Sequence, residues 1–121
     1  MKVAELEGAL LDYWVAKAAG MPVDEQDQRA PYALGVVTPD RGVVPFSPSK
    51  DWSLAGPIIE REEICIGLYN SAGGEWFASP KAWMSHDLVV REIFMVATTP
   101  LIAAMRAFVA SKFGYEVDIA A

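Results

Sequence analysis

The sequence has 121 residues but only one cysteine and one histidine. One cysteine cannot form an intrachain disulfide, and zinc sites take three or four nitrogen, sulfur or carboxylate ligands from the protein. These shortages exclude a disulfide-stapled scaffold and almost any zinc site built by one chain. The cysteine, Cys65, stands between Ile64 and Ile66, so we expect a buried, reduced thiol.

The sequence also lacks a long hydrophobic run. The longest nearly uncharged stretch, residues 93–105, is interrupted by Thr98, Thr99 and Pro100 and is too short to span a bilayer. Three charges within residues 1–7 interrupt the apolar core that a signal peptide needs. We therefore expect a cytoplasmic protein without membrane contact.

Basic residues are in short supply, with 10 Lys and Arg against 16 Asp and Glu and a net charge of -6. Binding to a phosphate backbone requires clustered Lys and Arg, so the charge balance argues against nucleic acid as a partner. Hydrophobic residues make up 53% of the chain, which is enough to fill a core and excludes disorder over most of it. The length predicts a single domain, 1–121.

The first predicted helix covers residues 4–19, where apolar side chains spread over a wide arc, and Gly20 followed by Pro22 ends it. Asp12 falls opposite this arc, whereas Glu7 falls inside it. Tyr13 and Trp14 are typical of core residues rather than of a cofactor site.

The final helix, residues 100–113, has the clearest signals. Thr99 fits the N-cap, Pro100 the first helical position and Gly114 the position that follows the helix. The helix carries few charges, so we expect it to be covered on two sides, by the first helix, a sheet or another subunit. Its smooth face consists of Ala103, Ala104, Ala107, Ala110 and Ser111.

Extended segments are predicted between the two helices, at 31–37, 43–46, 64–69, 75–78 and 88–96. A short helical turn capped by Ser49 is expected to end at Gly56-Pro57. The loop 70–74 joins two strands and is therefore a hairpin turn rather than a phosphate-binding loop. The pattern predicts an α+β domain, with N-terminal and C-terminal helices packed on a small antiparallel sheet.

Three segments together resemble a known family. They read Leu-Glu-Gly-Ala-Leu-Leu-Asp-Tyr-Trp-Val-Ala-Lys-Ala-Ala-Gly at 6–20, Ser-Pro-Ser-Lys-Asp-Trp at 47–52 with Gly-Pro-Ile-Ile-Glu-Arg-Glu at 56–62, and Thr-Pro-Leu-Ile-Ala-Ala-Met-Arg at 99–106 with Phe-Val-Ala-Ser-Lys-Phe-Gly at 108–114. Their order and spacing resemble the NinX family, small phage and prophage proteins of unknown function encoded in the nin region of lambdoid phages. The resemblance implies a phage-derived cytoplasmic accessory protein, and it implies no reaction.

Asp51-Trp52 is the pair with the most evident potential for binding, and two interpretations are open. The ring is a platform and the acid an orienting group in a ligand or peptide pocket. Alternatively, Trp52 fills the core and Asp51 caps the short helix, which makes the pair a loop anchor.

Glu60 follows two isoleucines and is either a buried acid with a raised pKa or half of an ion pair, with Arg106 as the candidate base. The candidate ligand- or partner-binding residues are Ser49, Asp51, Trp52, Glu60 and Arg106. We expect no catalytic set, because Ser85-His86-Asp87 is adjacent in sequence whereas triads assemble from separated segments. No cofactor is expected, and the acids at 60–63 with Asp51 are not spaced to require a cation.

Three functions follow. The leading hypothesis is a non-catalytic protein-interaction module that binds an unknown host or phage protein, with a homodimer as a further form, because Trp and Met are enriched in interface cores. The second is a small-ligand-binding protein or enzyme with a site around Asp51, Trp52 and Glu60. The third is an acidic DNA mimic, for which the acidic runs are 24–27 and 60–63.

Overall fold

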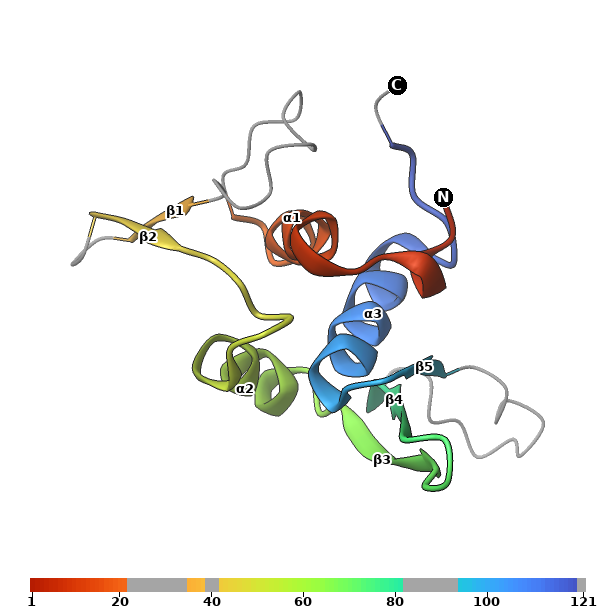
Figure 1. Ribbon diagram of the computed structural model, residues 1–121. Helices are drawn as coiled ribbons and strands as arrows, with labels where there is room; N and C mark the ends of the chain where they lie inside the picture. The colour runs from red at the N-terminus through yellow and green to blue at the C-terminus, as the bar shows by residue number, and fades with distance from the viewer. Residues whose placement is uncertain (22–34, 39–41, 82–93, 120–121) are drawn as a thin grey trace.

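The computed structural model describes residues 1–21, 35–38, 42–81 and 94–119 (Figure 1). Its helices are the 3-10 turn η1 (Val3–Glu5), α1 (Gly8–Ala18), α2 (Trp52–Arg61) and α3 (Pro100–Phe113). Its strands are β1 (Gly35–Thr38), β2 (Gly42–Pro45), β3 (Cys65–Asn70), β4 (Glu75–Ser79) and β5 (Met95–Ala97). The fold is α+β, as the sequence predicts, with α1 and α3 packed against each other and α3 against the sheet.

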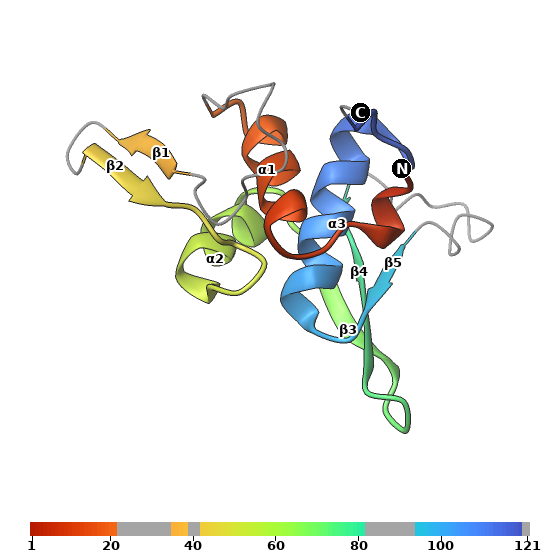
Figure 2. The same cartoon turned by 45° about the horizontal axis from the view of Figure 1, so that its top comes forward.

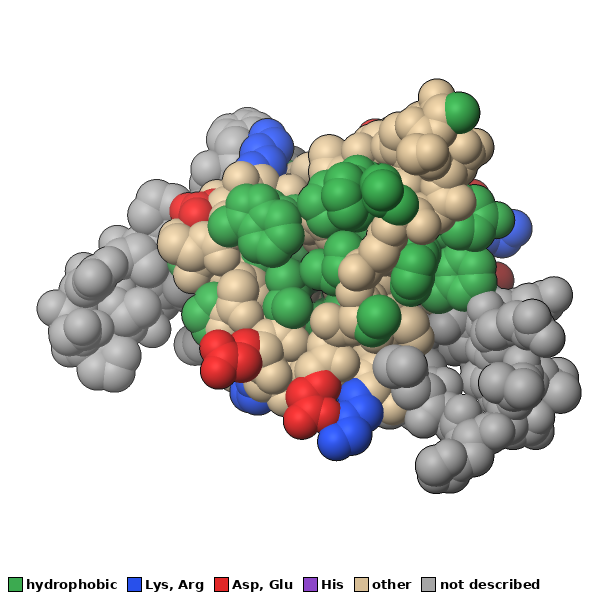
Figure 3. Space-filling model, turned by 90° about the horizontal axis from the view of Figure 1, so that it is seen from below, with side chains coloured by type: hydrophobic (Ala, Val, Ile, Leu, Met, Phe, Trp, Pro, Cys, Tyr) green, Lys and Arg blue, Asp and Glu red, His purple; other side chains and the backbone are tan. Residues whose placement is uncertain are grey.

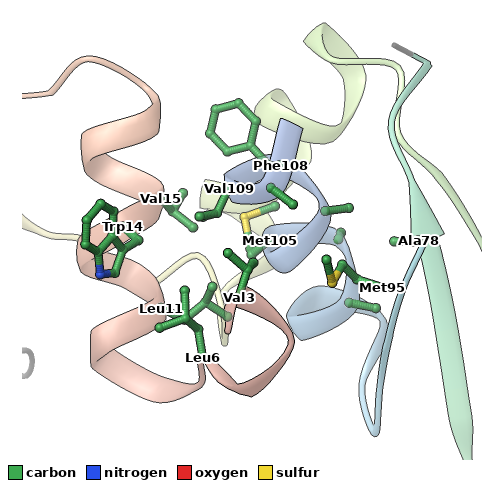
Figure 4. Packing of buried hydrophobic residues seen from close by; sticks show 14 of the residues in the cluster. Val3, Leu6, Leu11, Trp14, Val15, Ala78, Met95, Met105, Phe108 and Val109 are labelled. Atoms are coloured by element: carbon green, nitrogen blue, oxygen red, sulfur yellow. The ribbon is translucent and has the colours of Figure 1, made fainter. Parts of the chain in front are cut away.

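The C-terminal helix α3 lies at the centre of the molecule, between α1 on one side and the strands β3, β4 and β5 on the other (Figures 1 and 2). In Figure 4, Val109 faces Val15 of α1, while Met95 and Ala78 of the sheet lie on the other side of the helix. The helix is therefore buried almost all round, which confirms the expectation from its low charge. Its buried residues are Leu101, Ala103, Ala104, Met105, Ala107, Phe108, Val109 and Ala110.

The ends of α3 are set by local chemistry, and both predicted boundaries are confirmed. The Thr99 hydroxyl accepts a hydrogen bond from the backbone N–H of Ile102 at 3.1 Å, which satisfies one of the free amides of the first turn. Gly114 has a φ of 87°, a backbone conformation that glycine adopts without steric cost.

The three-stranded sheet is antiparallel, with the order β3-β4-β5, and β3 and β4 form the predicted hairpin. Partnered residues share a face, so Ile66, Leu68, Trp76, Ala78, Met95 and Ala97 form the face that points toward α3. The other face carries Cys65, Gly67, Tyr69, Phe77 and Val96. Cys65 is exposed, so the expectation of a buried thiol is wrong: Cys65 lies on the side of the sheet that α3 does not cover.

The second helix differs from the expectation. It does not end at Gly56-Pro57 but continues to Arg61, with Pro57 inside it. A proline inside a helix removes one backbone hydrogen bond. Here Pro57 is exposed, while Ala55 and Ile58 are buried in the core. Packing of this stripe outweighs the local signal, since tertiary contacts routinely override helix propensity.

The first helix also begins later than predicted. Residues 3–5 form the separate turn η1, and α1 starts at Gly8. Glu7 is therefore the exposed N-cap residue rather than part of the apolar arc. Of the predicted strands, 31–37 and 88–96 lie partly outside the described residues, and their described parts are β1 and β5. No helix of the described segments is both long and apolar enough to cross a membrane.

The end of α2 contains a strained residue. Glu63 has a φ of 51°, a left-handed backbone conformation that residues other than glycine rarely adopt. The N–H of Ile64 donates to the carbonyl of Ile59 at 3.0 Å, and the N–H of Glu63 donates to that of Glu60 at 3.3 Å. This is a Schellman termination with glutamate where glycine is usual, and it turns the chain from α2 into β3.

Replacing this residue tests the strain. The Glu63 carboxylate forms an exposed ion pair with Lys81 at 2.7 Å, and both Glu63→Gly and Glu63→Ala remove it. Only glycine relieves the left-handed backbone, so we expect Glu63→Gly to be more stable than Glu63→Ala by about 1 kcal/mol. Urea unfolding of the two variants measures the difference. Equal free energies of unfolding would show that the turn does not constrain this position.

Candidate functional site

The loop that leads into α2 is fastened to α1 by a buried carboxylate. The backbone N–H of Ser49 donates to Asp12 Oδ1 at 2.8 Å, and the Ser49 hydroxyl donates to Oδ2 at 3.0 Å. Asp12 is only 3% exposed and Ser49 only 4%. Both carboxylate oxygens therefore hold one residue of the loop, and this contact places the start of α2 relative to α1.

Ser49 is one of the predicted site residues, whereas its partner Asp12 is not. The sequence predicts that Asp12 lies opposite the apolar arc of the first helix, and the structure buries it instead. A signal does exist, because Gly8 and Ala16 lie four residues before and after Asp12 and so flank it on the same helix face. Small neighbours on both sides allow another residue to approach the helix backbone, as Ser49 does here, with its hydroxyl oxygen 3.5 Å from the carbonyl oxygen of Gly8.

Burial raises the pKa of Asp12, because a carboxylate loses hydration there. The two hydrogen bonds from Ser49 and the nearby charge of Lys50 favour the ionised form and lower the pKa, but the effect of burial is larger. The link between α1 and the loop is therefore sensitive to protonation.

Asp51 caps α2, as the anchor interpretation predicts. Its Oδ1 accepts hydrogen bonds from the N–H of Ser53 at 2.9 Å and from the Ser53 hydroxyl at 2.6 Å. These bonds lower the pKa of the carboxyl group. The other half of the anchor interpretation is wrong, because Trp52 does not fill the core but is 55% exposed. The structure holds the ring in solvent at the first turn of α2.

Glu60 and Arg106 do not form the expected ion pair. Glu60 is exposed near the end of α2. Arg106 is half-buried, and its guanidinium donates to the carbonyl oxygens of Leu6 at 2.7 Å and Val96 at 3.0 Å. Burial lowers the pKa of Arg106, while the charge of Glu7 raises it. Through these two hydrogen bonds, Arg106 links α3 to the N-terminal segment and to β5.

The five predicted site residues therefore lie in three different places. Ser49, Asp51 and Trp52 are at or just before the start of α2, Glu60 is near the end of α2, and Arg106 is on α3. Asp51 and Glu60 are nine positions apart. At about 100° and 1.5 Å per residue, they stand on opposite sides of the helix and about 13 Å apart along its axis.

The acidic run 60–63 is largely paired. Glu62 contacts Arg61 at 3.0 Å and Lys112 at 3.5 Å, and Glu63 contacts Lys81. Across the described part of the chain, no group of three or more His, Cys, Asp or Glu side chains could hold a metal ion. His86 and the acidic run 24–27 lie outside the described residues.

Large hydrophobic side chains are exposed at the start of α2 and on β3. They include Trp52, Leu68 at 57% and Tyr69 at 54% exposure. Figure 3 shows the molecule from below, where hydrophobic side chains gather over α2 and the three-stranded sheet, with charged side chains near the border. Such a surface, rimmed by polar groups, is typical of protein binding.

The Asp12–Ser49 contact predicts a measurable pH dependence. A raised pKa in the folded state means that the folded protein retains the Asp12 proton after the unfolded chain has lost it. Stability from this group is therefore lost as pH rises from its ordinary pKa of 3.8 through the raised value. Asp12→Asn keeps an acceptor for the Ser49 N–H without charge. We expect its stability relative to the wild type to increase as pH rises through this window.

Asp12→Ala is the matched variant, because it leaves both donors of Ser49 without an acceptor. We expect it to lose about 2–4 kcal/mol of stability, more than Asp12→Asn. Urea unfolding of the wild type and both variants at several pH values measures these differences. A wild-type to Asp12→Asn difference that is independent of pH would contradict the assigned shift.

Comparison with known families agrees with the resemblance of the three segments. The sequence profile of the family described as bacteriophage P22 NinX matches residues 2–112, which include α1, α2, the three-stranded sheet and nearly all of α3. No protein of curated function matches the chain. The chain therefore belongs to the phage NinX family, whose nin-region members have no known function.

Proposed function

We propose that the protein is a non-catalytic protein-interaction module that binds a host or phage protein through the first turn of α2, with Trp52 at the centre of the contact. The observation that carries this proposal is the exposure of the Trp52 ring on a firmly held helix start. Tryptophan is enriched among the residues that dominate binding energy at protein interfaces.

The immediate surroundings of Trp52 support this role. The Asp51 side chain binds Ser53 on the C-terminal side of the ring, and Ser49 is bound to Asp12 on the N-terminal side. The backbone on both sides of Trp52 is thus ordered before a partner arrives. A preorganised contact loses less conformational entropy on binding than a flexible loop does.

A small-ligand site or an active site around Asp51, Trp52 and Glu60 is less well supported. One carboxylate oxygen of Asp51, Oδ1, already accepts two hydrogen bonds from Ser53, and Glu60 stands at the far end of the helix. Substrate chemistry would require these groups to converge within hydrogen-bonding distance of one molecule.

The acidic DNA mimic is also less well supported. A mimic presents ordered rows of unpaired carboxylates, whereas Glu62 and Glu63 contact Arg61, Lys81 and Lys112. The proposed partner is instead a protein with an apolar pocket that receives an indole ring.

Substitution of Trp52 tests the proposal. The tagged protein is used to capture partners from lysate of phage-infected host cells, and a captured protein is then purified and titrated against the wild type and Trp52→Ala. We expect Trp52→Ala to weaken binding by a factor of about 30, the loss of about 2 kcal/mol typical of a central interface tryptophan. Because the side chain is largely exposed, the variant should unfold within about 0.5 kcal/mol of the wild type.

Tyr115→Ala is the matched control, since this aromatic residue is 52% exposed but belongs to the C-terminal segment. It should bind as tightly as the wild type. Equal affinities of Trp52→Ala and the wild type for every captured protein would refute the role of α2.

A further inference from the structure

The β3 strand is an unpaired edge of the sheet. Within the described residues it pairs only with β4, so one row of its backbone N–H and C=O groups has no partner strand. Edge strands of this kind readily accept another strand, and proteins usually protect them with charged residues, proline or a covering segment.

Charge and proline are absent from β3, which reads Cys-Ile-Gly-Leu-Tyr-Asn, and the β-bulge between Leu68 and Asn70 lies at the end of the strand. The segment Cys65–Leu68 is therefore a regular, uncharged edge. The opposite edge differs. The strand β5 has only three residues, and the carbonyl of its central residue, Val96, is bound by the Arg106 guanidinium. Among the described residues, the two edges of this sheet thus differ, and β3 is the edge better suited to accept a further strand.

The side chains of β3 are exposed where a new strand would cover them. Leu68 and Tyr69 point to opposite faces of the sheet, and both are more than half exposed. Tyr69 also packs on Phe94, which contacts Phe77, so an aromatic layer already lies on the outer face. The Phe77 ring covers Gly67, where an added Cβ would lie only 2.6 Å from the ring.

We propose that β3 pairs antiparallel with β3 of a second copy of the chain, about a two-fold axis at Gly67. This self-association is independent of the proposed Trp52 contact. In this register Ile66 lies opposite Leu68 of the other copy, on the face that α3 covers, and Cys65 lies opposite Tyr69 on the outer face. Each exposed hydrophobic side chain thus gains a hydrophobic or neutral neighbour, and the sheet grows to six strands.

The lack of charge in β3 permits this register. With a two-fold axis at Gly67, the paired positions 65–69 of both copies carry no charge, and Glu62 and Glu63, in the turn before β3, stay outside the paired segment. An axis at Cys65 would bring the residues of this turn, which are not extended, opposite Gly67 and Leu68, and an axis at Leu68 would place the β-bulge next to the centre of the pairing. Strand register follows the pairing that keeps apolar positions together, and here that is the axis at Gly67.

Analytical ultracentrifugation of the full chain tests the association. At about 100 μM, well above a micromolar Kd, we expect twice the chain mass of 13.2 kDa. Leu68→Lys sets an ammonium group against Ile66 of the second copy and should give a monomer at this concentration. Trp52→Lys, at an equally exposed position on α2, should remain a dimer. A monomeric wild type would overturn the proposal and would leave the β3 edge to a different partner. A Leu68→Lys variant that still forms a dimer would overturn it as well.

Disulfide cross-linking tests the register, because the chain has one cysteine. The two Cys65 residues would stand about 14 Å apart, four residue steps along the paired strands, which is too far for a disulfide. Tyr69→Cys sets a new thiol directly opposite Cys65 of the second copy, so mild oxidation should produce a covalent dimer. Leu68→Cys should not cross-link, because its side chain is on the other face. Cross-linking of Leu68→Cys but not of Tyr69→Cys overturns the axis at Gly67.

Discussion

The structure depends on the burial of α3 from two sides. This helix contacts α1, α2, η1 and each strand of the three-stranded sheet. Such proximity is possible because its surface alternates large side chains with alanines, which let neighbouring backbones approach closely. Arg106, a charged residue on this helix, fits the arrangement because its guanidinium bonds carbonyls from two of the segments that α3 joins. Hydrophobic packing sets the position of the layers, and Arg106 fixes how they are joined at one end.

The buried contact between Asp12 and Ser49 fixes the position of the loop before α2 more precisely than hydrophobic packing does. Apolar side chains such as Ala55 and Ile58 hold α2 against the core, but such contacts tolerate small shifts. The Asp12 carboxylate accepts two hydrogen bonds from a single residue, Ser49, and only one position of the loop satisfies both. The desolvation of the carboxylate has a free-energy cost, which the raised pKa reflects. We infer that this cost is retained because it fixes the direction in which α2 begins.

The features that the sequence predicts well are those with local causes. The boundaries of α3 follow from Thr99, Pro100 and Gly114, and the β3–β4 hairpin follows from its glycine-rich turn. The features that it misses depend on distant segments. The burial of Asp12 requires a loop 37 residues away in the chain, and the helix continues through Pro57 because of the core beneath it. The exposure of Trp52 fits one of the two interpretations that the sequence leaves open, because no local signal distinguishes an exposed ring from one that fills the core.

Trp52, Leu68 and Tyr69 stay outside although the core has taken up comparable side chains. Trp14 and Phe108 are almost completely buried, and α3 is enclosed on both sides without help from the exposed groups. Burying a large hydrophobic side chain contributes about 1.5–3 kcal/mol, so exposure of three in the free chain leaves several kcal/mol of stabilisation unused. Two of them project from opposite faces of one strand end, so no single helix of the same chain could cover both. We infer that an added strand or a partner surface covers them, so that their exposure is a property of the monomer and their burial would be a property of the assembly.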